Sequence, residues 1–220
     1  MRSAIIVAMV AVWAGLSAHP TFGQSCEPQR GVPCAAQSTI DPLMFGNTSG
    51  NPMYHYPSPT CGCSPVAGYR VTVRDYQGTP VEHAHIRVRF ATANFKALTV
   101  QTGMTANCAG HYLETTAGTT GTGFITFQPR FGGDAALFAQ EIEILAVTAT
   151  HTVSLGYIQG RTVDYDKNGN CGLGDFSIFS AYYLNGDLRG DFDNSFNISL
   201  QDLTIFSAEF NASGSNPPCP

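Results

Sequence analysis

The 220-residue chain is weakly charged, because only 12% of its residues are Asp, Glu, Lys or Arg, and its net charge is −5. This composition excludes the basic surface that nucleic-acid binding requires. The 23 glycines and 13 prolines favour short strands joined by turns. The acidic residues are concentrated near the carboxyl end, where residues 164–210 hold eight acids and two bases.

Residues 1–23 have the features of an export signal. Arg2 provides a positive start, and a 13-residue apolar run from Ala4 to Leu16 is followed by small and polar residues. This run is too short to cross a bilayer as a helix, and no other segment is longer and equally apolar. The sequence therefore predicts cleavage after Ala18 or Gly23, no membrane span, and a secreted, extracellular or cell-surface bacterial protein.

Seven cysteines follow the predicted signal: Cys26, Cys34, Cys61, Cys63, Cys108, Cys171 and Cys219. In an exported protein this number indicates disulfides, and the odd total leaves at least one thiol free or paired between molecules. Residues 24–66 are rich in Pro, Gly, Ser, Asn and Cys. We predict that they form an irregular, disulfide-pinned segment or a linker.

Residues 67–159 are predicted to form an antiparallel β-module. Apolar and polar residues alternate in Tyr69–Arg74 and in His85–Phe90, which is typical of strands with one buried face. Three further strands are expected at Gly123–Gln128, Glu141–Thr148 and Thr152–Ile158. Strands at this spacing favour a small antiparallel sandwich.

One stretch within this module carries a family resemblance. The pattern V-x-V-x-D-x-x-G-x-P-V-x-x-A-x-I-x-V-x-F, from Val71 to Phe90, resembles bacterial immunoglobulin-like surface modules. The resemblance implies that residues 67–159 form an immunoglobulin-like sandwich, and it implies no particular activity.

An internal repeat of 27 residues organises the last predicted module, residues 160–220. A shift of 27 residues places DFSIFSAYY, which begins at Asp175, on DLTIFSAEF, which begins at Asp202. The same shift places Asp164 on Asp191 and Asp166 on Asp193. In each unit the acids therefore occupy positions 1, 3 and 12 of a twelve-residue loop.

A loop with this spacing can enclose Ca²⁺, which takes six to eight oxygen ligands. The candidate ligands in the first loop are Asp164, Asp166, Asn168, the carbonyl of Asn170, and Asp175. Those in the second loop are Asp191, Asp193, Ser195, the carbonyl of Asn197, and Asp202, with Ser199 acting through a water. The alternative interpretation is a pair of solvated acidic loops.

The two loops differ at position 6, where a tight turn favours a positive φ angle. Gly169 occupies this position in the first loop, whereas Phe196 occupies it in the second. A left-handed conformation costs a bulky residue about 1–2 kcal/mol. We therefore expect one or two Ca²⁺ ions, with tighter binding in the first loop.

Apolar residues at helical spacing follow each loop. They are Phe176, Phe179 and Tyr183 after the first loop, and Leu203, Phe206 and Phe210 after the second. Each predicted helix is too short to be stable alone in water. We expect the two helices to pack face to face, with bound metal supplying much of the folding free energy.

The two loop-helix units, from Asp164 to Phe210, resemble the type I dockerin family. The resemblance implies two Ca²⁺ ions, antiparallel helices, and docking onto a cohesin-like module of a scaffold or cell surface. Many dockerins carry a Lys-Arg pair where this chain has Ser180-Ala181 and Ser207-Ala208. Leu173-Gly174 and Leu200-Gln201 likewise replace the Ser and Thr pairs that usually contact cohesin.

Because the two ends of a dockerin lie close together, the resemblance also makes Cys171 and Cys219 a candidate disulfide. An N-terminal cysteine is the rival partner.

No catalytic motif is present: the chain lacks G-x-S-x-G, H-E-x-x-H and a phosphate-binding loop. Glu141 and Glu143 share one side of a predicted strand and could serve a glycosidase. His83 and His85 could hold zinc with His111 or His151, but the neighbouring arginines oppose a dication. The sequence favours a non-catalytic binding or attachment protein. A small polysaccharide-degrading component and a carbohydrate-binding module remain the alternatives.

Overall fold

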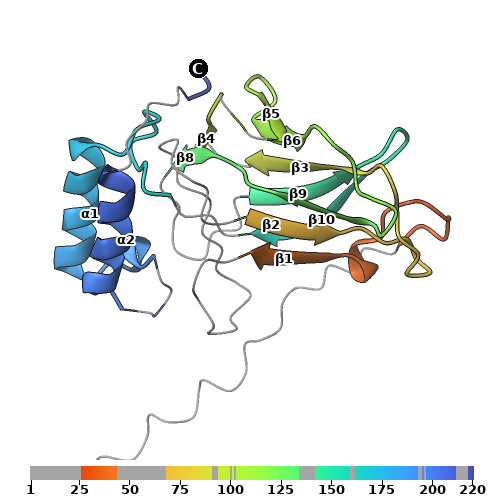
Figure 1. The fold of residues 1–220 in the computed structure, drawn as a ribbon, viewed down its shortest axis with the longest axis horizontal. Helices are drawn as coiled ribbons and strands as arrows, with labels where there is room; N and C mark the ends of the chain where they lie inside the picture. The colour runs from red at the N-terminus through yellow and green to blue at the C-terminus, as the bar shows by residue number, and fades with distance from the viewer. Residues whose placement is uncertain are drawn as a thin grey trace, which may run out of the picture.

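The computed structural model describes residues 26–43, 68–90, 94–99, 101, 103–133, 142–158, 162–192, 195, 197–211 and 218–220. It is mainly antiparallel β-structure, followed by two short helices at the carboxyl end (Figure 1). The predicted export signal lies outside the described residues. Within the described ranges, no helix has both the length and the apolar character needed to cross a bilayer.

The described β region contains ten strands in three antiparallel sheets. Their bounds are β1 (Thr39–Leu43), β2 (Gly68–Thr72), β3 (His85–Phe90), β4 (Phe95–Ala97), β5 (Met104–Asn107), β6 (Tyr112–Thr115), β7 (Phe124–Phe127), β8 (Phe131–Gly133), β9 (Ile142–Val147) and β10 (Thr152–Ile158). The sheet orders are β1-β2-β7, β10-β9-β3-β6-β5 and β4-β8. We refer to β4 and β8 together as the β4–β8 ribbon.

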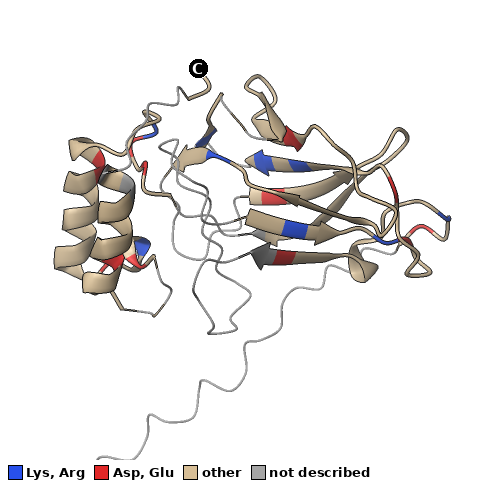
Figure 2. Cartoon of the chain, in the orientation of Figure 1, with Lys and Arg blue, Asp and Glu red and all other residues tan. Residues whose placement is uncertain are grey.

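All three sheets contribute to one hydrophobic core. On β3 the alternation predicted from the sequence is confirmed, because Ile86, Val88 and Phe90 are buried in this core. The intervening Arg87 and Arg89 lie on the opposite face and pair with Glu114 of β6 and Glu143 of β9. Basic positions on β3 lie next to acidic positions on adjacent strands (Figure 2). The predicted strands near β2, β3, β7, β9 and β10 are all present.

The amino-terminal segment is more regular than the sequence predicts. Within residues 24–66, the five residues Thr39–Leu43 form a strand that pairs with β2, with Ile40 opposite Val71. Composition does not predict this strand, because it is short and contains Pro42, a residue type that is tolerated on an edge strand such as β1. A disulfide between Cys26 and Cys34 precedes it, in agreement with the predicted disulfide-pinned character.

The helical region begins with the first acidic loop and contains α1 (Leu173–Asn185), a 3-10 turn η2 (Leu188–Gly190) and α2 (Leu200–Asn211). Both predicted helices are therefore present, and their first residues are one 27-residue repeat apart. Helix α1 is capped by Gly186, whose φ of 64° is the left-handed conformation that glycine adopts just after a helix. The two helices lie side by side (Figure 1).

The predicted pairing of Cys171 with Cys219 is wrong. Cys219 forms a disulfide with Cys108, which follows strand β5, and Cys171 remains a buried thiol in the core of the helical region. The carboxyl end does not stay beside the first loop. It returns to the β region, where Pro218 bridges to Leu98, and this brings Cys219 to Cys108.

Candidate metal centre

Three carboxylates of the first loop converge in space. One oxygen each from Asp164, Asp166 and Asp175 lies within 4.8 Å of the others. Asp164 and Asp175 are fully buried, whereas Asp166 is exposed. In the part of the chain that the structure describes, this is the one group of three or more His, Cys, Asp or Glu residues arranged so that it could hold a metal ion.

The backbone of the first loop curls around the carboxylate of Asp164. The backbone N–H of Asn168 donates to Oδ1 at 3.0 Å, and that of Gly169 donates to Oδ2 at 2.9 Å. Gly169 has a φ of 82°, as position 6 of the loop predicts, and Lys167 also has a positive φ, of 63°. Glycine reaches this conformation without the steric cost that a side chain imposes.

Asp175 serves the first loop and helix α1 together. Its Oδ1 accepts the N–H of Asp166 at 3.1 Å, and its Oδ2 accepts the N–H of Gly172 at 2.8 Å. Gly172 is the N-cap residue of α1 and Asp175 is the third residue of the helix, where a carboxylate satisfies a free N–H and interacts favourably with the helix dipole. Position 12 of the loop is thus fixed by the start of the helix.

The buried carboxylates repel one another in the absence of a cation. Burial, with smaller contributions from the Asp175 and Asp166 carboxylates, raises the pKa of Asp164 to about 7, against the opposing effect of the N–H donors of Gly169 and Asn168. Burial likewise raises the pKa of Asp175 above its ordinary value. A bound divalent cation offsets such repulsion, and an all-oxygen donor set suits Ca²⁺. The residues present therefore fit this ion.

Asn168, at position 5, lies beside the same group. Its Nδ2 donates to Asp166 Oδ2 at 2.8 Å, and its Oδ1 accepts the N–H of Asn170 at 2.8 Å. The loop thus brings the side chains predicted at positions 1, 3, 5 and 12 together.

The second loop repeats part of this geometry. Asp191 and Asp202, at positions 1 and 12, are both buried. The N–H of Ser195 donates to Asp191 Oδ1 at 3.1 Å and that of Ser199 to Asp202 Oδ2 at 2.8 Å. These two bonds are the 27-residue equivalents of Asn168–Asp164 and Gly172–Asp175 in the first loop.

The remaining predicted ligands of the second loop are described only in part. Asp193 lies outside the described residues, as does Phe196. The hydroxyl of Ser195 donates to the carbonyl oxygen of Asn197 at 3.0 Å, so these two predicted ligands are hydrogen-bonded to each other. The first loop is therefore the better-defined candidate site.

An aromatic core joins the two loop-helix units. Phe179 of α1 stacks on Phe206 of α2, and Tyr165 of the first loop lies 6.2 Å, between ring centroids, from Phe192 of the second. Tyr182, which the apolar pattern did not place in the core, is also buried there. The side chains of this core pack the two loop-helix units against each other.

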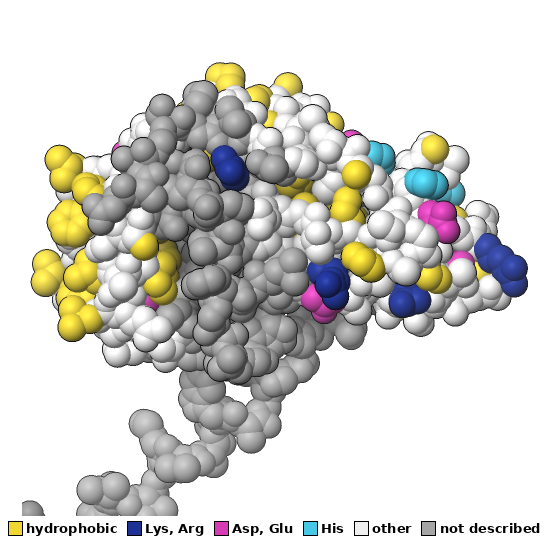
Figure 3. All heavy atoms as spheres, viewed as in Figure 1, with side chains coloured by type: hydrophobic (Ala, Val, Ile, Leu, Met, Phe, Trp, Pro, Cys, Tyr) yellow, Lys and Arg dark blue, Asp and Glu magenta, His cyan; other side chains and the backbone are white. Residues whose placement is uncertain are grey.

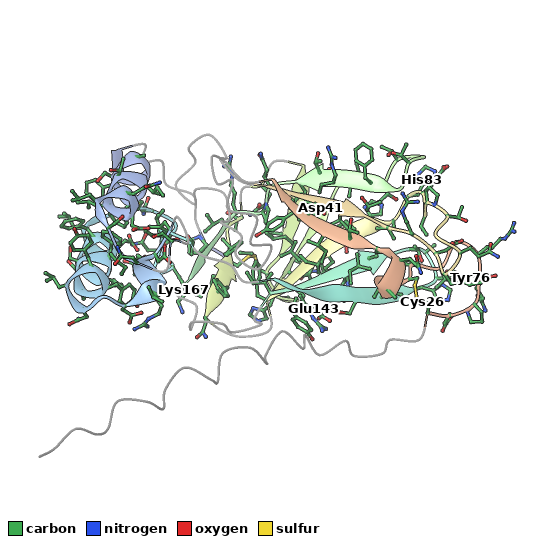
Figure 4. The ribbon with its side chains drawn as sticks, turned by 90° about the horizontal axis from the view of Figure 1, so that it is seen from below. Cys26, Asp41, Tyr76, His83, Glu143 and Lys167 are labelled. Carbon is green, nitrogen blue, oxygen red and sulfur yellow. A yellow bond between two sulfur atoms is a disulfide. The ribbon has the colours of Figure 1, made fainter. Side chains whose placement is uncertain are left out.

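The histidines considered from the sequence form no metal-binding group among the described residues, and only one member of the Glu141–Glu143 pair is described. Glu143 is buried and forms an ion pair with Arg89, and Glu141 lies outside the described residues. The His85 ring nitrogen Nδ1 lies 2.7 Å from the carbonyl oxygen of Thr115. His83 lies at the end of the β region far from Lys167 of the first loop (Figure 4). The described geometry therefore concentrates candidate chemistry in the helical region.

Two glycines that contact the candidate site were not singled out from the sequence. A Cβ atom on Gly174 would lie 2.7 Å from Asp166 Oδ2, and one on Gly132 of β8 would lie 2.3 Å from Asp164 Oδ2. No motif in the sequence predicts the second contact, because Gly132 is 32 residues from Asp164 and lies on a strand of the β region.

Comparison with known proteins assigns no family. No family model matches the chain, and no curated protein matches it. Among solved structures, a chain described as "ZirS C-terminal Domain" is similar over 73% of this chain and 87% of its own length, at 16% identity and a TM-score of 0.25. A likeness of this size carries no argument about fold or function.

Proposed function

We propose that this chain is a secreted, non-catalytic attachment protein whose helical region is a calcium-stabilised, dockerin-like docking module. The observation that carries the proposal is the convergence of Asp164, Asp166 and Asp175 in the first loop. Three carboxylates so close together, two of them buried, need a compensating charge. The side chains of these residues and of Asn168 would hold Ca²⁺, which would order the loop.

The duplicated geometry supports a pair of sites. Equivalent backbone donors bind the position 1 and position 12 carboxylates in both loops. Asp191 and Asp202 are buried, as Asp164 and Asp175 are. We therefore assign a second, weaker Ca²⁺ site to the second loop.

The surface of the helical region supports docking. Leu173 and Leu200, the first residues of α1 and α2, are 74% and 71% exposed, and Leu184 is 83% exposed. Hydrophobic side chains gather over the helical end of the molecule (Figure 3). Exposed apolar patches of this kind mark protein interaction sites. The partner we propose is a cohesin-like or other cell-surface protein that presents an apolar face to the two leucines.

In this proposal the β region is an immunoglobulin-like sandwich that acts as a spacer or carries its own ligand. The ion pair of Glu143 with Arg89 supports a structural role for this carboxylate and not a catalytic one.

Calorimetric titration with Ca²⁺ tests the metal sites. The wild-type chain, first treated with EDTA, should release or absorb heat on calcium addition and should melt at a higher temperature afterwards. Asp175→Asn should lose the tighter site, and Asp41→Asn, an exposed carboxylate on β1, is the matched control. Absence of both heat and a melting shift in the wild type would disprove the proposal.

Pull-down of extracellular proteins, with and without calcium, tests docking separately. Leu173→Ser combined with Leu200→Ser should abolish calcium-dependent capture while leaving the calcium titration unchanged. Binding of the chain to a glycan array without these leucines being required would instead assign the function to the β region.

A further inference from the structure

The β4–β8 ribbon contacts both ends of the helical region. On β8, the backbone N–H of Gly133 donates to the carbonyl oxygen of Asp164 at 2.8 Å. On β4, the carbonyl oxygen of Ala97 accepts the N–H of Cys219 at 2.8 Å, next to the bridge between Leu98 and Pro218. The entry to the first loop and the tail after α2 are thus fixed to the two paired strands of one ribbon.

The contact on β8 reaches the candidate ligand itself. A Cβ atom on Gly132 would lie 2.3 Å from Oδ2 and 2.8 Å from Cγ of Asp164, closer than a Cβ atom can approach. Asp164 is fully buried. The backbone of Gly132 therefore packs directly against the Asp164 carboxylate, which leaves no room for a side chain at position 132.

Strand β8 cannot withdraw easily from this carboxylate. Phe131, the residue before Gly132, is fully buried, and its ring lies 5.2 Å from that of Phe90 and 5.3 Å from that of Phe95, between ring centroids. Tightly packed cores resist displacement, so a bulkier residue at 132 would displace Asp164 before it displaced the strand.

We propose that Gly132 is a positioning residue of the first calcium site, and that the ribbon couples calcium binding to attachment of the helical region. This inference rests on the proposed function, since it assigns a further role at the same site. Asp164 holds the ion with its carboxylate and holds the ribbon with its carbonyl oxygen. By linkage, the free energy that the ribbon contributes to calcium binding equals the free energy by which bound calcium strengthens the contact between the ribbon and the first loop.

The second loop provides an internal comparison. Asp191 follows Gly190, where an added Cβ atom would meet Ile198 and Tyr182 at 3.2 Å and Phe179 at 3.4 Å, all within the helical region. The residues packed beside Gly190, next to Asp191, therefore belong to the helical region, whereas the glycine packed against Asp164 belongs to the β region. We therefore expect a change in the β4–β8 ribbon to alter calcium affinity at the first site and not at the second.

The experiment compares Gly132→Ala with Gly121→Ala in the full chain. Gly121 is a matched control because it lies in the β region and a Cβ atom there would approach only the flexible side chain of Glu82, at 3.3 Å. Calorimetry should show that Gly132→Ala weakens the tighter calcium site by about 10-fold or more, the cost of losing a supporting contact at a metal site. Gly121→Ala should stay within about twofold of the wild type by the same measure.

Melting with calcium and with EDTA separates positioning from general destabilisation. Positioning requires that Gly132→Ala lower the melting temperature more with calcium than with EDTA, whereas a purely structural role lowers it equally in both. Equal calcium affinity of Gly132→Ala and wild type overturns the coupling but leaves the proposed function intact. Failure of the wild type to bind calcium overturns both.

Hydrogen exchange in the wild-type chain gives a result even if Gly132→Ala does not fold. Calcium should slow exchange of the Gly133 amide, because the ion orders the carbonyl that accepts it. Unchanged protection of this amide in a calcium-binding chain would overturn the proposal.

Discussion

Phe179 and Phe206 stack across the helical region, with ring centroids 4.7 Å apart and ring planes inclined by 13°. The two residues are one 27-residue repeat apart, and so are Tyr165 and Phe192, which also contact each other. Equivalent positions meet in this way where two repeats are related by a local twofold axis. Phe176, early in α1, also lies near Phe210, late in α2, which is the arrangement of antiparallel helices. The sequence repeat is thus a structural repeat.

The stack predicts a large effect of truncating one ring. Phe206→Ala should lower the free energy of unfolding of the helical region by about 3–5 kcal/mol, because a buried ring is lost and a cavity remains. Leu184→Ala is the control, since Leu184 is 83% exposed and should change stability by no more than about 0.5 kcal/mol. Urea denaturation followed by near-ultraviolet circular dichroism measures both. Similar losses in the two variants would contradict the stacked core.

Gly174 predicts opposite effects on helix stability and on metal binding. It lies in the first turn of α1, and a Cβ atom added at this position would lie 2.7 Å from Asp166 Oδ2. Gly174→Ala should favour the helix by up to about 1 kcal/mol in EDTA, because glycine is a poor helix former.

With calcium the same variant should bind the ion more weakly, because the added methyl group displaces the Asp166 carboxylate. Calorimetry and melting in the two conditions would show the reversal. The 27-residue equivalent, Gln201→Ala, is the control, because that helix position already carries a side chain. Tighter calcium binding by Gly174→Ala would be inconsistent with this arrangement.

The two disulfides should differ in their contribution to stability. Cys108 and Cys219 are 111 residues apart, whereas Cys26 and Cys34 are 8 apart. In the chain-entropy model, closing the longer loop stabilises by about 5 kcal/mol and closing the shorter one by about 2.5 kcal/mol. Double serine variants of each pair, compared by denaturant unfolding, should therefore rank in this order. The reverse ranking would show that loop closure does not dominate.

The hydrogen bonds that the Asp75 carboxylate accepts predict that the protein loses stability in acid. Burial alone would raise the pKa of Asp75, but N–H donors from Thr79, Gly31 and Gln77 outweigh burial and lower it below its ordinary value of 3.8. A lowered folded-state pKa contributes stability above about pH 4, which is lost as the pH falls through the folded-state value.

Asp75→Asn should therefore be less stable than the wild type at pH 7, and the difference should shrink as the pH falls below about 4. Thermal melts across this range measure the difference. A constant difference from pH 7 to pH 3 would exclude ionisation of Asp75 as the cause.

Local patterns in the sequence determined much of this protein. Alternating residues fixed β3, because one face of a strand must be buried. The 27-residue repeat fixed the positions of both helices and of the loops before them, because helix starts and turn glycines such as Gly169 depend on neighbouring residues. These features need no information from distant parts of the chain.

Tertiary structure alone decided the contacts between distant segments. The partner of Cys219 proved to be Cys108, because the tail returns along β4, and β1 formed because β2 offered an edge. Gly132 meets Asp164 because β8 and the first loop converge from different parts of the chain. Such contacts depend on how sheets and helices pack together, and residues that are not neighbours in the sequence leave no periodic signal of their meeting.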